Sequence, residues 1–152
     1  MKKTSGFTLV ELVLAIVAVP VLLIAVVLVI DPAKLVEDSR NTQRIADVES
    51  ILVAVNKYIA DNNSVPLGIT VNESQLGTDT DGCEIFAKGC AVTNGSCLNL
   101  QDPLSKYLDP IPIDPKIGTA GKTGYSILLN KDKKIIIKAC GAEGLENIYT
   151  VY

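Results

Sequence analysis

The sequence contains no histidine and no tryptophan, and it has one methionine and two phenylalanines among its 152 residues. Histidine is the commonest general acid–base of enzymes and a frequent zinc ligand, so its absence removes many catalytic and metal-binding designs. We also find no nucleophile beside a base and no glycine-rich loop that would cradle a phosphate. The sequence therefore predicts a protein that is not an enzyme and needs no cofactor.

Clustered positive charge is also scarce. The formal net charge is −3, and acids and bases are mixed along the chain beyond Lys3. The one exception is a short group formed by Lys131, Lys133 and Lys134. Because a nucleic-acid surface needs grouped cations to neutralise phosphates, we predict no nucleic-acid partner. We interpret the three lysines as a solvated hairpin turn.

The four cysteines are Cys83, Cys90, Cys97 and Cys140. An even number of cysteines in a small exported domain favours disulfide bonds. Four cysteines allow three pairings, and the sequence does not choose among them. A zinc site is disfavoured because the spacings differ from those of the usual short zinc knuckle and no histidine is available.

A long apolar run lies near the start of the chain. No charged or polar side chain occurs between Leu12 and Ile30, and about 20 such residues suffice for a helix to cross a bilayer. Lys2 and Lys3 precede the run, which predicts a cytoplasmic N-terminus and an extracytoplasmic head. This orientation agrees with the separate inference that the head contains disulfides.

The chain after the run is predicted to begin a second helical segment. Asp31 can cap a helix and Pro32 suits its first position, so we expect a helix over residues 33–62. Its apolar stripe is predicted to face a sheet and consists of Ile45, Val48, Ile51, Leu52, Val55, Tyr58 and Ile59. Its polar surface is predicted to include Arg40, Arg44, Asp47, Glu49 and Lys57.

The remaining residues predict loops followed by β-structure. Residues 63–122 are rich in glycine, asparagine, aspartate and proline and contain three of the cysteines, which predicts disulfide-held loops. Residues 124–130 and 133–140 read as a hairpin, and residues 147–152 as a third strand. Helix first and antiparallel strands later is an α+β order. The tyrosines are expected to pack rather than to stack on ligands: Tyr58, Tyr107, Tyr125, Tyr149 and Tyr152.

Three interpretations compete for the N-terminal stretch. A secretory signal peptide has a shorter apolar core and a small-residue cleavage site after it, and neither is present. A simple membrane anchor explains the run and its lysines but leaves Glu11 unexplained. A carboxylate at the centre of a membrane helix costs about 2.5–3.5 kcal/mol, less near the interface, and usually marks a paired functional group. An assembly device would account for all of these residues.

The stretch Gly6-Phe7-Thr8-Leu9-Val10-Glu11 resembles the processing motif of the type IV pilin and type II secretion pseudopilin family, whose precursors are called prepilins. The resemblance covers residues 1–30 closely. The later amphipathic helix and C-terminal sheet are similar to the family architecture more loosely, as is Pro-Ile-Asp-Pro at 112–115 with a tyrosine-bearing strand after it. It implies a pilin-like fold: a long N-terminal helix whose C-terminal half packs on a small antiparallel sheet.

The resemblance also implies a function for each part. Residues 1–6 would be a leader that a prepilin peptidase removes between Gly6 and Phe7, with N-methylation of Phe7. Residues 7–30 would be the transmembrane and filament-core helix, and residues 31–152 the extracytoplasmic head. The subunit would polymerise helically with copies of itself, through pilus assembly machinery in the inner (cytoplasmic) membrane. Glu11 of one subunit would then meet the Phe7 amine of its neighbour.

Two alternatives stay open. The filament is either a pilus on the cell surface or a periplasmic pseudopilus of a type II secretion system. In a different class of function, the chain is a monomeric, membrane-anchored binding protein that never polymerises. The fold class, α+β, is the same in each case.

Calcium is considered because some pseudopilins bind it in the head. Asp79, Asp81 and Glu84 alternate before and after a glycine like half of a calcium loop, but the later ligands do not follow. We therefore predict a solvated turn at these residues and no metal.

Overall fold

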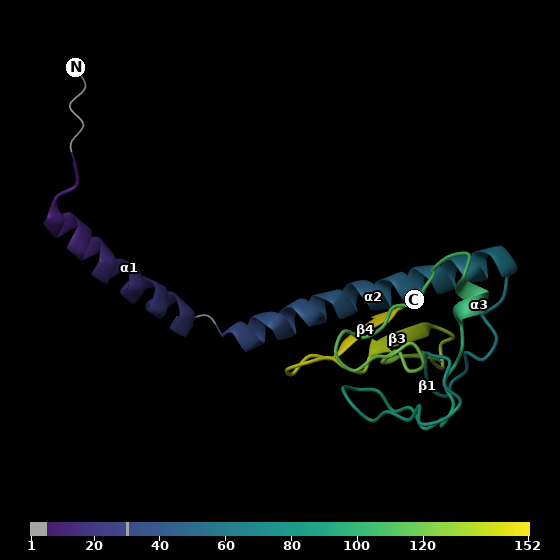
Figure 1. Ribbon diagram of the computed structural model, residues 1–152. Coiled ribbons are helices and arrows are strands. Elements are labelled where there is room, and N and C mark those ends of the chain that lie inside the picture. Colours follow the sequence, from purple (N-terminus) through teal and green to yellow (C-terminus); the bar gives the residue numbers. More distant parts are fainter. Residues whose placement is uncertain (1–5, 30) are drawn as a thin grey trace, which may run out of the picture. The chain divides into compact units, whose positions relative to one another are not determined.

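The computed structural model describes the backbone of residues 6–29 and 31–152, and the side chains of the same residues apart from 25–29. The fold is α+β, with helices and a four-stranded antiparallel sheet (Figure 1). The chain divides into two compact units, residues 1–36 and 37–152. The predicted leader 1–6 lies outside the described residues except for Gly6, and Lys2 and Lys3 lie outside them altogether.

The prediction of one long N-terminal helix is confirmed only in part, because two helices occupy that region. Helix α1 spans Leu9–Val29 and helix α2 spans Pro32–Asn62. The Asp31 carboxylate accepts hydrogen bonds from the N–H groups of Ala33 and Lys34, at 3.0 and 3.4 Å. Asp31 is thus the N-cap of α2 and Pro32 its first residue, as the sequence predicts.

The sheet consists of β1 (Ser74–Gln75), β2 (Tyr125–Leu129), β3 (Ile135–Ala139) and β4 (Ile148–Val151), in that spatial order. All neighbouring strands are antiparallel. The three C-terminal strands lie within the predicted ranges, and β2 and β3 form the predicted hairpin. Strand β1 was not predicted, because two polar residues give no alternating pattern. A short helix, α3 (Gln101–Leu104), lies in the loop region.

The core lies between α2 and one face of the sheet. Val48, Ile51 and Val55 of α2 are buried in one cluster with Tyr125 and Ile137, among other residues. Alternate residues of β3 are buried, as expected for a strand with one covered face. Figure 1 shows α2 running along this sheet, with β3 and β4 beside it.

The predicted stripe of α2 is wrong at its first residue. Ile45 is 46% exposed, whereas Arg44, assigned to the polar surface, is completely buried. Counting from Arg44, the steps to Val48, Ile51 and Val55 are the four- and three-residue intervals of one helix face. The buried face of α2 therefore includes a charged side chain, Arg44, whereas the neighbouring apolar side chain of Ile45 is exposed to solvent.

Candidate functional site

The predicted processing site lies just before α1. Gly6 and Phe7 are exposed and belong to no helix or strand, and the Phe7 side chain is 83% exposed. A peptide bond must be accessible and extended for a protease to bind it, and the Gly6–Phe7 bond meets the first requirement in the isolated chain.

Thr8 and Glu11 form a reciprocal cap at the start of α1. The Thr8 hydroxyl accepts a hydrogen bond from the Glu11 N–H at 3.3 Å. The Glu11 carboxylate accepts from the Thr8 N–H and from the Thr8 hydroxyl, both at 2.9 Å. This is a capping box, in which a threonine and a glutamate three residues later satisfy each other's free N–H groups. Sequence reasoning missed this role, although the Thr-x-x-Glu spacing was visible.

The capping box leaves one carboxylate oxygen of Glu11 available. Both bonds go to Oε2, and Oε1 accepts no hydrogen bond from any of the residues that the structure describes. Glu11 therefore has a partner within its own chain and retains the capacity to accept a donor from another molecule.

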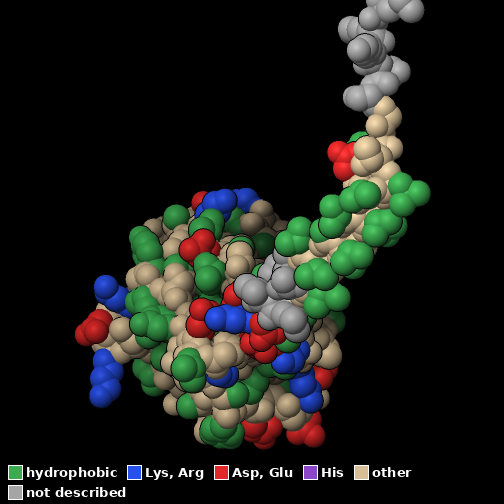
Figure 2. All heavy atoms as spheres, turned by 90° about the vertical axis from the view of Figure 1, so that its left-hand side faces the viewer, with side chains coloured by type: hydrophobic (Ala, Val, Ile, Leu, Met, Phe, Trp, Pro, Cys, Tyr) green, Lys and Arg blue, Asp and Glu red, His purple; other side chains and the backbone are tan. Residues whose placement is uncertain are grey.

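Helix α1 is apolar on every side. Its sequence contains a single charged residue, Glu11, and the large apolar side chains from Leu12 to Ile24 are 49% to 66% exposed. Figure 2 shows these hydrophobic side chains along the face of α1 turned to the viewer. Such a surface is stable only when apolar material covers it.

Within the described part of the chain, no helix has both the length and the apolarity needed to cross a membrane. The predicted span, residues 7–30, continues through residues 25–30, whose side chains lie outside the described set.

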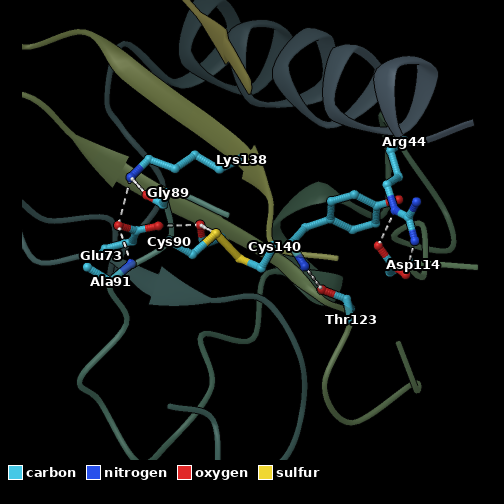
Figure 3. Close-up of a disulfide and its surroundings, with 11 residues drawn as sticks. Arg44, Glu73, Gly89, Cys90, Ala91, Asp114, Thr123, Lys138 and Cys140 are labelled. Carbon is cyan, nitrogen blue, oxygen red and sulfur yellow. Dashed lines mark hydrogen bonds and ion pairs between the residues drawn. A yellow bond between two sulfur atoms is a disulfide. The ribbon is translucent and has the colours of Figure 1, made fainter. Parts of the chain in front are cut away.

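The structure selects one of the three possible disulfide pairings. Cys83 is bonded to Cys97, and Cys90 to Cys140. Because Cys90 lies within the loop closed by the first bond, the second bond fastens that loop to the end of β3. Figure 3 shows the second bond beside Glu73 and Lys138. The prediction of disulfides in the head is confirmed.

Polar contacts hold the same loop against the outer face of the sheet. The Glu73 carboxylate accepts hydrogen bonds from Lys138 Nζ at 2.9 Å and from the Ala91 N–H at 3.1 Å. Lys138 Nζ also donates to the carbonyl of Gly89 at 2.7 Å, and Ser126 Oγ donates to Glu73 at 2.5 Å. The loop is thus attached to the sheet by charge and by a covalent bond.

The weak calcium candidates do not converge. Asp79 Oδ2 lies 3.9 Å from Lys122 Nζ, while the carboxylates of Asp81 and Glu84 lie next to Gly95 instead. No three carboxylate or thiol side chains of the described residues form a group that could hold a metal ion.

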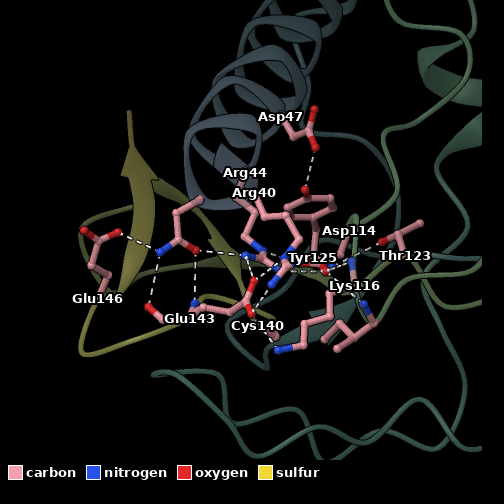
Figure 4. A network of polar contacts seen from close by, with 12 residues as sticks. Arg40, Arg44, Asp47, Asp114, Lys116, Thr123, Tyr125, Cys140, Glu143 and Glu146 are labelled. Carbon is pink, nitrogen blue, oxygen red and sulfur yellow. Dashed lines mark hydrogen bonds and ion pairs between the residues drawn. The ribbon is translucent and has the colours of Figure 1, made fainter. Parts of the chain in front are cut away.

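The most elaborate polar site of the head was not predicted. We call it the ionic cluster; it consists of Arg40, Asn41, Arg44, Asp114, Lys116 and Glu143 (Figure 4). Arg44 donates two hydrogen bonds to Asp114, from Nε at 2.7 Å and from Nη2 at 3.0 Å. Both side chains have no exposed surface. The cluster therefore joins α2 to the loop before β2.

Glu143 connects the second half of the cluster. Its carboxylate accepts two hydrogen bonds from Arg40, at 2.5 and 2.7 Å, and further bonds from Lys116 at 2.5 Å and from Arg44 at 3.1 Å. The Asn41 amide binds the backbone of Glu143 twice: its Nδ2 donates to the Glu143 carbonyl at 3.2 Å, and its Oδ1 accepts from the Glu143 N–H at 3.0 Å. The loop between β3 and β4 is thereby fastened to α2.

Glycines make room for Asp114. A Cβ at Gly141 would lie 2.4 Å from Asp114 Oδ2, and a Cβ at Gly124 would lie 2.7 Å from Asp114 Cβ. Gly124 also has a φ of +82°, a conformation that side chains strongly disfavour. The backbone around Asp114 is therefore shaped to admit this buried pair.

The electrostatics of the cluster favour its charged state. Burial opposes the charge on Asp114, but hydrogen bonds from Arg44 and the Ile117 and Lys116 N–H groups outweigh it, so its pKa is lowered. Hydrogen bonds from Arg40 and then Lys116 lower the pKa of Glu143 strongly.

A neighbouring pair behaves oppositely. Tyr125 donates its hydroxyl to Asp47 Oδ2 at 2.5 Å. Burial raises the pKa of Asp47, and burial followed by the bond to Asp47 raises the pKa of Tyr125. Tyr125 thus packs as predicted and also makes a polar contact with α2.

The geometry of the ionic cluster is typical of a structural contact between elements rather than of a reactive site, since each of its carboxylates is already neutralised by a guanidinium or ammonium group.

No protein-family model, curated protein or solved structure matches this chain.

Proposed function

We propose that the chain is the structural subunit of a helical filament of the type IV pilus kind, made from a precursor that is cut between Gly6 and Phe7. The mature subunit is held in the cytoplasmic membrane by its N-terminal helix and then joins a filament on the cell surface. The head stays outside the membrane throughout. Its partners are copies of itself, the prepilin peptidase and the assembly machinery.

The observation that carries this proposal is the surface of α1. Between Leu12 and Ile24 its large apolar side chains are 49% to 66% exposed on every side of the helix. A bilayer can cover such a surface, and so can the same helix from neighbouring copies. One segment therefore serves both stages, storage in the membrane and packing in a filament core.

Glu11 is the group that would give such a bundle its register. Cutting before Phe7 creates a positive α-amine close to the start of α1, and Glu11 carries the single charge of that helix. An amine and a carboxylate of neighbouring copies relieve each other's desolvation in apolar surroundings. Oε1, which accepts nothing from the described residues, is the oxygen available for this contact.

A monomeric, membrane-anchored binding protein is the second candidate, and the capping box favours it. Because Thr8 already satisfies part of the Glu11 carboxylate, a lone subunit has a use for this residue without any neighbour. In that case α1 would only anchor the head.

Two measurements on the native full-length chain separate these candidates. Intact mass of the mature protein tests the cut, and retention of Met1–Gly6 would remove the processing step. Electron microscopy of sheared surface material tests polymerisation. We expect filaments that are labelled through a tag placed on this chain. A fully processed protein found only as membrane-bound monomer would overturn the filament and leave the anchored monomer.

The location of the filament distinguishes pilus from pseudopilus. A pilus subunit is recovered from the medium by shearing, whereas a periplasmic pseudopilus requires disruption of the envelope. Loss of protein export on deletion of the gene, with no loss of surface fibres, would identify the secretion role.

A further inference from the structure

A groove on the head lies between α2 and the edge strand β4. Its volume is about 560 Å³, and its lining combines the apolar residues Ile45, Val48 and Ile148 with the polar residues Asn147 and Thr150. Ile45 is 46% exposed there although it lies on the helix that supplies the core. This position is the one at which the apolar pattern of α2 departs from its buried face.

Two carboxylates border the same groove, Glu49 of α2 and Glu146 before β4. Glu49 is exposed, and it forms no ion pair with any residue that the structure describes. The Glu146 Oε2 atom accepts one hydrogen bond, from the Asn41 amide at 3.0 Å. We name this feature the acidic groove; it presents apolar and polar surface beside two carboxylates.

The backbone of β4 adds unpaired polar groups beside the groove. Ile135 and Tyr152 exchange both backbone hydrogen bonds, at 3.2 and 3.0 Å. Along an antiparallel pair of strands, residues whose N–H and C=O groups bond to the partner strand alternate with residues whose N–H and C=O groups point away from it. Tyr149 and Val151 therefore turn their N–H and C=O groups toward the open edge, where another chain can reach them.

The groove suits a ligand with apolar stems and positive ends, and this chain carries one. The turn between β2 and β3 contains Lys131, Lys133 and Lys134, all exposed. Within the described part of the chain, none of the three ammonium groups forms an ion pair. We name residues 130–134 the basic turn. Lysine side chains can lay their methylenes on apolar surface and keep the ammonium at a polar rim.

The basic turn of a copy cannot fill its own groove. The turn lies beyond Ile135, which is opposite Tyr152, whereas the groove is lined in and just before β4 by residues 146–150, with Ile148 in the middle of that range. At about 3.3 Å per residue, the four residue steps from Ile148 to Tyr152 separate the turn from the middle of the groove by roughly 13 Å, beyond a lysine's reach. Donor and acceptor surfaces therefore lie toward opposite ends of the sheet.

We propose that the acidic groove of one subunit receives the basic turn of the next subunit. This rests on the proposed function, and it names the contact between heads in the filament. The two surfaces differ, so the contact is heterologous and can repeat without closing, as a helical polymer requires. Opposite charges also set the direction in which successive heads stack.

Charge reversal with rescue tests the contact in the full chain. Glu49→Lys places like charges together, and so does the pair Lys131→Glu with Lys134→Glu. Each is expected to lower the yield of sheared filament about tenfold or more, since like-charge contacts cost several kcal/mol. The triple variant that combines them restores opposite charges and is expected to recover most of the yield. Glu84→Lys and Lys57→Glu, exposed elsewhere on the head, are matched controls that keep wild-type yield.

A carbodiimide cross-link gives a second readout that does not need filaments. Unlabelled and ¹⁵N-labelled full-length chains are purified in detergent, mixed and reconstituted into the same membranes before coupling, and the coupled Lys–Glu peptides are identified by mass. Peptides joining the basic turn to Glu49 or Glu146, with one labelled and one unlabelled half, are the expected result. Their absence, or pairs only within one isotope, would overturn the proposed contact, as would a triple variant that stays defective.

The two proposals fail in different ways. Filaments that form normally in all charge variants refute this contact and leave the filament function standing. A wild-type chain that forms no filaments refutes the proposed function, and the cross-link in membranes then still decides whether heads associate through this groove.

Discussion

Arg44 and Asp114 form a two-point ion pair with no exposed side-chain surface, with Nε 2.7 Å from Oδ2 and Nη2 3.0 Å from Oδ1. The two residues belong to α2 and to the loop before β2. A buried pair of this kind contributes little net stability compared with an apolar pair, because both charges lose water. Its geometry nevertheless requires one alignment of the loop on the helix, so it specifies how the head is assembled.

Removing one member of this pair is predicted to be severe. Asp114→Ala leaves the Arg44 guanidinium buried without its main partner, which typically costs about 3–5 kcal/mol. Urea unfolding of the purified full chain in detergent, followed by near-ultraviolet circular dichroism of its tyrosines, measures the loss. Asp132→Ala removes a carboxylate from an exposed turn and is expected to stay within about 0.5 kcal/mol of wild type. Equal effects of the two substitutions would contradict the burial of the pair.

Acid is predicted to weaken the head through the same cluster. Asp114 and Glu143 have lowered pKa values in the folded chain. Their contribution to the free energy of unfolding is therefore fully present above the unfolded pKa of about 4 and is lost as the pH falls below it. Asp47 has a raised pKa and opposes this trend, because protonation removes the desolvation cost of burying its charged carboxylate. The thermal midpoint is therefore expected to be level from pH 7 to pH 5 and to fall below about pH 4.

Glu143→Gln identifies the source of that acid sensitivity. The variant lacks the titrating group, so its midpoint should be lower at pH 7 and should fall less between pH 5 and pH 3. Asp132→Asn, a neutralisation on an exposed turn, should retain the wild-type slope. A wild-type slope in Glu143→Gln as well would assign the acid sensitivity to other carboxylates.

Much of the head could be predicted because its signals are local. The β-branched run Ile135-Ile136-Ile137 predicts a strand, and Asp31-Pro32 predicts a helix start, since each pattern needs only neighbouring residues. The buried face of α2 was predicted wrongly at Arg44, because a charged residue is normally assigned to the solvent-exposed surface. Its partner Asp114 lies 70 residues away, and no pattern within the helix indicates that pairing.

The features of the candidate site likewise differ in whether a local sequence signal indicates them. The Thr8–Glu11 capping box is a local signal that could have been found from its spacing. The disulfide pairing, the short strand β1 and the ionic cluster depend on which loops lie together in three dimensions. None of these can be obtained from composition or periodicity.

The two disulfides are predicted to contribute unequally. Cys90–Cys140 closes a sequence separation of 50 and Cys83–Cys97 one of 14. In the chain-entropy account the longer loop is worth about 4 kcal/mol and the shorter about 3 kcal/mol. Paired Cys→Ser substitutions, compared by urea unfolding under non-reducing conditions, are expected to follow this order. A larger loss from the shorter loop would mean that native contacts, rather than loop entropy, dominate.

Glu11 has two candidate roles, and substitutions can separate them. Glutamine at this position keeps an oxygen that caps Thr8 but carries no charge, whereas alanine removes both functions. If Glu11 pairs with the Phe7 amine of a neighbour, Glu11→Gln should abolish filaments as fully as Glu11→Ala, with membrane insertion unchanged. Filaments retained in Glu11→Gln but lost in Glu11→Ala would assign the residue to capping alone.

Thr8→Ala provides the reciprocal variant. It removes the threonine hydroxyl from the capping box, with a typical cost of about 1 kcal/mol in helix stability, and leaves the carboxylate charged. Under the pairing hypothesis this variant should still assemble, because the Glu11 carboxylate loses a local partner and stays available to a neighbouring amine. Sheared-filament yield, normalised to membrane-inserted subunit, is the measurement. A defect in Thr8→Ala as large as that in Glu11→Gln would show that the start of α1 matters to assembly more than the charge it presents.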